Sequence, residues 1–192
     1  MSALILIRHS LTEGNERRLY YGATDLPLTE AGRALCQSLR GGYDLPDGIH
    51  FATSGMLRAE QTLELLFGDV PHERFPDLRE AEMGIFEMKS YDELKDTPAY
   101  QRWLADTSGQ FEIPGGESNR QVLARVTRCV EVLARRGGNW LIVCHGGVIA
   151  CALNALFPEG KPSFWDWVPG ACHGYAVEFE PDTDAPRAFW EI

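Results

Sequence analysis

Residues 3–9 read Ala3-Leu4-Ile5-Leu6-Ile7-Arg8-His9, an unbroken apolar run that ends in two basic side chains. Such a run is typical of a strand buried on both faces, as in a parallel sheet. Further short strands are predicted at 49–53 and 140–144, each followed by a helical pattern, at 56–67 and up to about 156. This alternation predicts an α/β fold of three layers, α/β/α, with a mainly parallel central sheet.

The remaining elements are predicted from their end signals. A helix beginning near Leu28 ends at Gly41-Gly42, and another begins at Ser118, which forms a capping box with Gln121. Two closing strands are expected at 174–179 and 188–192, with a turn at 181–186, and a helix broken near Pro98 is expected at 91–106. We interpret residues 1–192 as one domain, with a lid-like insertion at about 80–116.

Composition limits the partners. The net charge of −10 disfavours nucleic acid and anionic membranes, which are bound through lysine and arginine. A phosphate-binding site would therefore have to gather its basic residues locally.

The five cysteines have irregular spacing without C-x-x-C, which favours free thiols in the cytoplasm over disulfides or a zinc site. No secretory leader or membrane span is expected, and the oligomeric state stays open.

Basic side chains follow three of the predicted strands. Arg8 and His9 end the first strand, Arg58 lies just beyond the second, and His145 follows residues 140–144. Ligands of open α/β sheets bind beyond the carboxyl ends of the strands, so these four side chains are expected to converge there.

This group suits phosphoryl chemistry. A neutral imidazole is a nucleophile if one ring nitrogen is free and the other has a hydrogen-bond acceptor. Arginine donates two parallel hydrogen bonds to phosphoryl oxygens, and a cationic second histidine could bind the same oxygens. A carboxylic acid is needed to protonate the departing alkoxide.

Several motifs resemble, in order, those of the histidine phosphatase superfamily, which includes cofactor-dependent phosphoglycerate mutases and related phosphatases. They are Arg8-His9-Ser10-x-Thr12-x-x-Asn15, Gly22-x-x-Asp25-x-Pro27-Leu28-Thr29-x-x-Gly32, Thr53-Ser54-x-x-Leu57-Arg58-Ala59-x-Gln61-Thr62, Leu78-Arg79-Glu80-x-x-x-Gly84, Gly115-Gly116-Glu117-Ser118 and Val143-Cys144-His145-Gly146-Gly147.

The resemblance implies a metal-independent phosphatase without a cofactor, acting on a small phosphorylated metabolite. His9 would become phosphorylated, and Glu80 would protonate the leaving oxygen and then activate water. The implied phosphate pocket contains Arg8, Asn15, Arg58 and His145.

The sequence departs from the family pattern at two places. Ser10 replaces the usual glycine, and its hydroxyl is a further candidate phosphate ligand. Phe86-Glu87-Met88 stands where the family often has Trp-Glu-Gly. Glu82 is an alternative to Glu80 as the acid, although the spacing to Gly84 favours Glu80.

Two other functions remain open: phosphoryl transfer within one substrate, as in a mutase, and non-catalytic binding of a phospho-ligand. Residues 83–112 hold only three basic residues, Lys89, Lys95 and Arg102, which favours a phosphatase because the mutases carry extra basic residues there. The stretch around Gly22 also resembles that of small bacterial phosphatases such as α-ribazole phosphatase, and that of the bisphosphatase acting on fructose 2,6-bisphosphate, so the substrate stays open. Trp165 and Trp167 are expected to pack in the core or on the surface rather than line the site.

Overall fold

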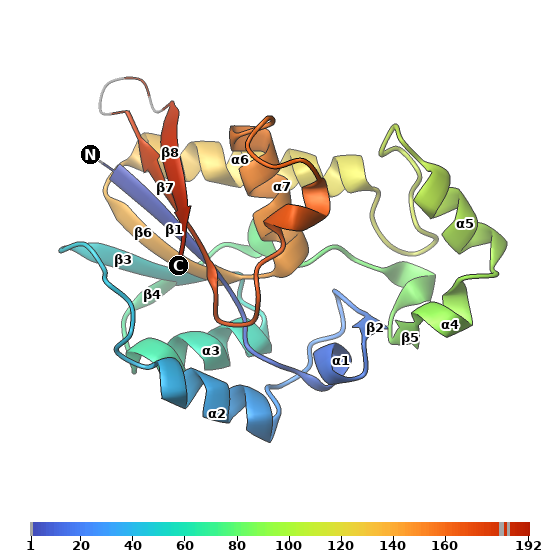
Figure 1. The fold of residues 1–192 in the computed structure, drawn as a ribbon, viewed down its shortest axis with the longest axis horizontal. Helices are drawn as coiled ribbons and strands as arrows, with labels where there is room; N and C mark the ends of the chain where they lie inside the picture. The colour runs from blue at the N-terminus through green and yellow to red at the C-terminus, as the bar shows by residue number, and fades with distance from the viewer. Residues whose placement is uncertain (1, 181–182, 184) are drawn as a thin grey trace.

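The structure is a computed structural model that describes residues 2–180, 183 and 185–192, so the expected turn at 181–186 lies partly outside the described residues. A six-stranded sheet has the order β4-β3-β6-β1-β7-β8 (Figure 1). Its strands are β1 (Ser2–Arg8), β3 (Ile49–Thr53), β4 (His72–Arg74), β6 (Asn139–Cys144), β7 (Gly174–Phe179) and β8 (Pro186–Glu191). Strands β1, β3, β4 and β6 pair in parallel, whereas β7 and β8 pair antiparallel. The predicted mainly parallel sheet is confirmed.

Helices cover both faces of the sheet. Figure 1 shows α2 (Glu30–Leu39) and α3 (Leu57–Phe67) on one side, and α6 (Asn119–Arg136) and α7 (Gly146–Leu156) on the other. The apolar run of β1 serves both layers: Leu4 and Leu6 pack in the cluster with α6 and α7, and Ile5 and Ile7 pack in the cluster with α3. The α/β/α layering is therefore confirmed, and the helix breaks as expected at Pro98.

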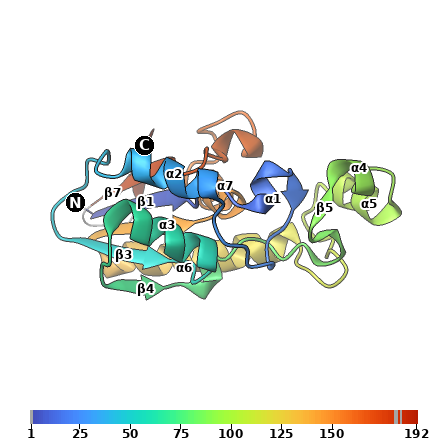
Figure 2. The same ribbon diagram turned by 90° about the horizontal axis from the view of Figure 1, so that it is seen from below.

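A separate segment extends from one end of the sheet (Figure 2). It contains α4 (Tyr91–Leu94) and α5 (Pro98–Ala105), which pack around a small core of their own formed by Phe86, Leu94, Tyr100 and Ile113. A two-stranded sheet of β2 (Leu19–Tyr20) and β5 (Lys89–Ser90) joins it to the chain after β1. Among the described residues, no helix is long and apolar enough to cross a membrane.

The elements that sequence patterns missed are short. They are β2, β4, β5, the helix α1 (Glu13–Glu16) and the 3-10 turns at Pro76–Leu78, Gly84–Phe86 and Phe164–Trp167. Two to four residues cannot show a period of 2 or 3.6, and all three residues of β4 are exposed at the sheet edge.

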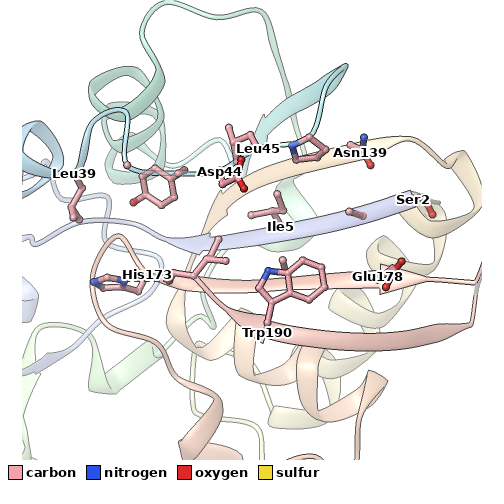
Figure 3. Close-up of a pocket in the computed structure, with 15 residues that line it drawn as sticks. Ser2, Ile5, Leu39, Asp44, Leu45, Asn139, His173, Glu178 and Trp190 are labelled. Carbon is pink, nitrogen blue, oxygen red and sulfur yellow. Dashed lines mark hydrogen bonds between the residues drawn. The ribbon is translucent and has the colours of Figure 1, made fainter.

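A cavity lies against one stretch of the sheet, beside the end of α2. Its volume is about 710 Å³, and the strands β1, β7 and β8 contribute Ile5, Ala176 and Trp190 to its lining (Figure 3). The loop after α2 forms the other wall with Tyr43 and Leu45. None of the predicted site residues lines this cavity.

Two neighbouring residues on α6 test this packing. Leu133 is buried against the sheet and Val132 is 37% exposed. We expect Leu133→Ala to lower the free energy of unfolding by about 2–5 kcal/mol, because it leaves a cavity in the core. Val132→Ala is the matched control and should change it by less than about 0.5 kcal/mol. Urea denaturation measures both, and equal effects would contradict this orientation of α6.

Candidate active site

Strand register brings the two histidines together. In the parallel pair β1–β6, Arg8 lies opposite Cys144, so His9 and His145 leave adjacent strands at the same level. Their ring centroids are 5.1 Å apart. In the neighbouring pair β3–β6, Thr53 lies opposite Val143, which brings Ser54 to the same edge. The carboxyl ends of the central strands therefore converge as the sequence predicted.

His9 has the arrangement that a nucleophilic imidazole requires. Its Nδ1 lies 2.7 Å from the carbonyl oxygen of Ser10, and since a carbonyl only accepts, Nδ1 carries the proton. Nε2 is then the unprotonated nitrogen. Burial, helped by the nearby charge of Arg58, lowers the pKa of His9 well below 6.5. The ring is therefore neutral at physiological pH, with one nitrogen free to attack.

Arg58 is completely buried at the start of α3. Its Nη1 and Nη2 donate to the carbonyl oxygens of Thr24 and Gly22 at 3.0 and 2.9 Å. Its Nε donates to Nδ1 of His145 at 3.2 Å. These bonds occupy one N–H on each nitrogen and leave two further N–H groups, which can meet an anion in the cavity that Arg58 lines.

The structure places His145 between Arg58 and Ser54, outside the lining of this cavity. Because arginine always donates, His145 Nδ1 accepts, and the proton lies on Nε2, which donates to Oγ of Ser54 at 2.8 Å. Burial, followed by the charge of Arg58, lowers the pKa of His145 well below 6.5. In this geometry the ring of His145 orients Arg58, and a contact between His145 and phosphate stays a prediction.

Arg8 and Asn15 both line the cavity, as predicted. Arg8 is anchored by Nη1, which donates to the carbonyl oxygen of Pro169 at 2.8 Å. Asn15 Oδ1 accepts hydrogen bonds from the backbone N–H and hydroxyl of Thr12 and from Oη of Tyr21, each at 3.0 Å. Its oxygen is thus occupied, and its NH₂ group is the side that remains to donate.

Ser10, by contrast, lies outside the cavity lining. Its hydroxyl donates to the carbonyl oxygen of Gly32 at 2.8 Å, and its backbone N–H donates to Oγ1 of Thr62. The hydroxyl is thus engaged away from the cavity, and its contact with phosphate stays a prediction. Through these two hydrogen bonds, Ser10 fixes the backbone next to His9.

The structure distinguishes the two acid candidates. Glu80 lines the cavity, and its Oε2 accepts a hydrogen bond from the backbone N–H of Gly147 at 3.0 Å. A Cβ at Gly147 would approach Oε1 to 2.7 Å, so a larger residue there would displace the Glu80 carboxylate. Glu82 lies outside the lining, and its carboxylate pairs with Arg79 at 3.7 Å. This geometry favours Glu80, as the spacing did.

Arg125 holds the segment that carries Glu80. Its guanidinium donates to the carbonyl oxygens of Asp77, Arg79 and Glu80 and to the carboxylate of Glu117. Sequence patterns missed this role, since an arginine on a helix is usually solvated. The available signal was the position of Arg125 among the apolar residues of α6, which indicates a buried side chain.

Glu87 is a second supporting residue that the sequence did not reveal. Its carboxylate accepts hydrogen bonds from the backbone N–H groups of residues 22–24 and Met83 and from the Thr24 hydroxyl. Burial alone would raise its pKa, but these hydrogen bonds outweigh burial and lower the pKa. Glu87 thereby holds the loop whose carbonyls hold Arg58. Met88, where the family often has glycine, has a φ of +58°.

Five of the seven predicted site residues line one cavity of about 600 Å³, namely Arg8, His9, Asn15, Arg58 and Glu80, whereas Ser10 and His145 lie outside its lining. Trp165 also lines this cavity, so the expectation of packing alone was wrong for Trp165. Trp167 is fully buried in the core, as expected. The arrangement offers a neutral nucleophile, two guanidinium groups and a carboxyl group around one space.

The tautomers can be measured directly. We expect ¹⁵N-detected NMR to show His9 protonated on Nδ1 and His145 on Nε2. Both rings should remain neutral as the pH falls through about 6.5, the ordinary value for histidine. Single variants His9→Asn and His145→Asn assign the signals. A cationic His145 at neutral pH would contradict the arrangement.

Glu87 has a pH-dependent signature. Replacing Glu87 by Gln should lower the free energy of unfolding by about 1–3 kcal/mol at neutral pH, because backbone N–H groups lose a charged acceptor. A carboxylate whose pKa is lowered by folding stabilises the folded state fully at pH values above its ordinary pKa of 4.5. This stabilisation is lost as the pH falls through the lowered pKa. The difference between wild type and variant should therefore shrink in acid. Glu82→Gln, on an exposed carboxylate, should change little.

Comparisons agree with this geometry. Residues 4–190 match the histidine phosphatase superfamily (branch 1). An adenosylcobalamin/α-ribazole phosphatase of Salmonella typhimurium is 31% identical over 169 residues, covering 84% of this chain and 83% of the relative. A probable phosphoglycerate mutase of Cronobacter sakazakii is 28% identical over 171 residues, covering 85% of this chain and 78% of the relative.

Solved structures give the same result. A putative α-ribazole-5′-P phosphatase from Escherichia coli superimposes with a TM-score of 0.82 at 26% identity, covering 97% of this chain and 93% of that one. A phosphoglycerate mutase from Thermus thermophilus gives a TM-score of 0.71 at 32% identity, with 94% of each chain covered. With its relatives named as phosphatases and mutases, the chain belongs to branch 1 of the histidine phosphatase superfamily.

Proposed function

We propose that the protein is a phosphomonoesterase that forms a phosphohistidine on Nε2 of His9. The observation that carries this proposal is the hydrogen bond from His9 Nδ1 to the Ser10 carbonyl oxygen, which leaves Nε2 as the free nitrogen. The ring reaches a cavity that Arg8, Arg58 and Glu80 also line. Nucleophile, anion-binding groups and acid thus share one space.

The proposed reaction has two steps. In the first, Nε2 of His9 attacks phosphorus, the P–O bond to the alcohol breaks, and protonated Glu80 gives its proton to the departing oxygen. Arg8 and Arg58 stabilise the charge on the phosphoryl oxygens. In the second, Glu80 takes a proton from water as the water attacks phosphorus and the N–P bond breaks. The products are an alcohol and inorganic phosphate.

The charge of the cavity favours hydrolysis over mutase chemistry. A phosphoglycerate mutase must hold a substrate that carries a carboxylate besides its phosphate group. Within the described residues, Arg8 and Arg58 are the only lysine or arginine side chains that line the cavity. Lys89, Lys95 and Arg102 of the 83–112 stretch lie outside the lining.

The first test is turnover of p-nitrophenyl phosphate in the presence of a metal chelator. Wild type should hydrolyse it and should show phosphohistidine at residue 9 by mass spectrometry after alkaline quenching. His9→Ala should show neither. A His9→Ala variant as active as wild type would contradict the mechanism, and interconversion of phosphoglycerates without net hydrolysis would identify a mutase.

Glu80→Gln tests the acid. We expect kcat/KM for an alkyl phosphate to fall by about 10²- to 10⁴-fold, because the alkoxide must leave without a proton. The loss should be smaller for p-nitrophenyl phosphate, whose phenolate needs little protonation. Glu82→Gln is the matched control and should behave like wild type. The opposite pattern would assign the acid to Glu82.

A further inference from the structure

Two of the cysteines form a contact between their sulfur atoms. Sγ of Cys36 on α2 lies 3.6 Å from Sγ of Cys172, in the loop that precedes β7. A disulfide bond holds the same two atoms about 2.05 Å apart, so a movement of roughly 1.5 Å would allow the bond to form. Both residues are free thiols and completely buried, and neither lines either of the cavities described above.

The backbone of Cys172 has a conformation that is unfavourable for a residue with a side chain. Its φ is +62°, in the left-handed region that favours glycine. Its N–H donates to the carbonyl oxygen of Arg8 at 3.0 Å, and its own carbonyl oxygen accepts from Oη of Tyr43 at 2.6 Å. These two bonds hold the residue while its sulfur contacts Cys36. Backbone strain of this kind is concentrated at functional positions.

The pair differs in acidity from the other three cysteines. Burial raises the pKa of Cys129 to about 11 and the pKa of Cys151 to about 12, and it also raises the pKa of Cys144. A hydrogen bond from the Cys172 thiol instead lowers the pKa of Cys36, although Cys36 is buried too. Since the thiolate is the form that reacts with oxidants, Cys36 is the nucleophile of the pair.

On the α2 side, hydrogen bonds connect the pair to the catalytic histidine. The hydroxyl of Ser10 donates to the carbonyl oxygen of Gly32, one helical turn before Cys36. The carbonyl oxygen of Ser10 accepts the hydrogen bond from Nδ1 of His9. Gly32 packs so closely that a Cβ there would lie 2.2 Å from the carbonyl oxygen of Leu11. A movement of α2 would therefore displace the backbone that fixes the tautomer of His9.

On the other side, the loop that contains Cys172 holds Arg8 at two points. Nη1 of Arg8 donates to the carbonyl oxygen of Pro169 at 2.8 Å, and the carbonyl oxygen of Arg8 accepts from the N–H of Cys172. A bond between the two sulfurs would draw this loop and α2 together. Catalysis tolerates little such movement, because a misplacement of about 1 Å can cost on the order of 10²-fold in rate.

The cavity beside the end of α2 reaches the side chains that cover the two thiols. Leu39 and Tyr43 line this cavity and also pack in the cluster that contains Cys36 and Cys172. His173, the residue after Cys172, lines the cavity as well (Figure 3). Because both sulfurs are completely buried, an oxidant must be close to water in size to reach them. A small hydroperoxide such as hydrogen peroxide meets this requirement.

We propose that Cys36 and Cys172 are a redox site at which a small hydroperoxide forms a disulfide bond, and that this bond disturbs the geometry around His9 and lowers turnover. The formation of the bond does not depend on the proposed function. Its effect on turnover rests on that function, and its effect on the geometry around His9 is measurable without it.

One molecule of hydrogen peroxide balances the reaction. The Cys36 thiolate attacks one peroxide oxygen, the O–O bond breaks, and Cys36 becomes a sulfenic acid. The departing hydroxide takes up the proton that the Cys36 thiol released and leaves as water. Sγ of Cys172 then attacks the Cys36 sulfur, the S–O bond breaks, and the second hydroxide leaves as water with the proton of Cys172. The two sulfurs lose two electrons, and the two peroxide oxygens gain them.

The first experiment measures the bond. Protein treated with hydrogen peroxide is unfolded, labelled with N-ethylmaleimide and digested for mass spectrometry. Two of the five thiols should escape labelling, the Cys36 and Cys172 peptides should be linked, and dithiothreitol should restore both thiols. Glutathione disulfide, which is too large to reach the sulfurs, should leave all five labelled. Five labelled thiols after peroxide, or a disulfide between other cysteines, would overturn the proposal.

The second experiment measures turnover of p-nitrophenyl phosphate. Oxidation should lower kcat/KM of wild type by at least about 3-fold, and dithiothreitol should reverse the loss. Cys36→Ser and Cys172→Gly cannot form the bond and should each keep their untreated rate after peroxide; glycine suits the φ of +62°. Cys129→Ala, which removes a buried thiol on α6, is the matched control and should remain as sensitive as wild type. An equal loss in Cys36→Ser would assign the effect to another residue and contradict the proposal.

The ¹⁵N signals of the His9 ring separate this proposal from the proposed function, because they need no turnover. They should shift when wild type is oxidised and stay unchanged in peroxide-treated Cys36→Ser. If the disulfide forms but neither these signals nor kcat/KM changes, the coupling to His9 is wrong and the proposed function stands. If the signals shift in a protein that hydrolyses no phosphate ester, the proposed function fails and the coupling stands.

Discussion

The burial of one guanidinium group organises the whole catalytic edge. A charge removed from water costs several kcal/mol unless it is paired and hydrogen-bonded. Arg58 donates hydrogen bonds to the carbonyl oxygens of Gly22 and Thr24 and to Nδ1 of His145. It also forms an ion pair with Asp25 at 3.8 Å. The backbone N–H groups of the same loop donate hydrogen bonds to the carboxylate of Glu87. A single buried ion thus couples the end of β3, the end of β6, the loop after β2 and the segment that carries the acid.

The same requirement gives two adjacent histidines opposite tautomers. A carbonyl oxygen next to His9 places its proton on Nδ1, whereas a guanidinium next to His145 keeps Nδ1 free of a proton. Both rings are buried and neutral, yet only His9 is left with an uncommitted nitrogen. The neighbour of Nδ1 thus decides which of the two rings has a nitrogen without a hydrogen-bond partner.

Sequence patterns predicted the site residues whose positions follow from strand order. They missed the roles that depend on hydrogen-bond partners distant in the sequence. His9, Arg8, Arg58 and Glu80 were predictable because strand ends and motif spacing are local. The neutral role of His145 was not, because it follows from Arg58, 87 residues earlier in the chain. Glu87 and Arg125 were missed for the same reason, since their partners are mostly main-chain groups, which leave no residue pattern. Trp165 was missed because exposure and proximity to a cavity are tertiary properties.

The oxygens that hold the Arg58 side chain at Gly22 and Thr24 belong to the main chain, and so do most of the groups that Glu87 binds. Every amino acid supplies the same carbonyl and, proline apart, the same amide. The exposed residue Ala23 can therefore be replaced by other amino acids except proline without changing the position of Arg58. Gly22 is the exception, because a Cβ there would lie 1.7 Å from the carbonyl oxygen of Ala81. The loop beside the cavity can thus change its surface side chain without altering the main-chain groups that hold Arg58.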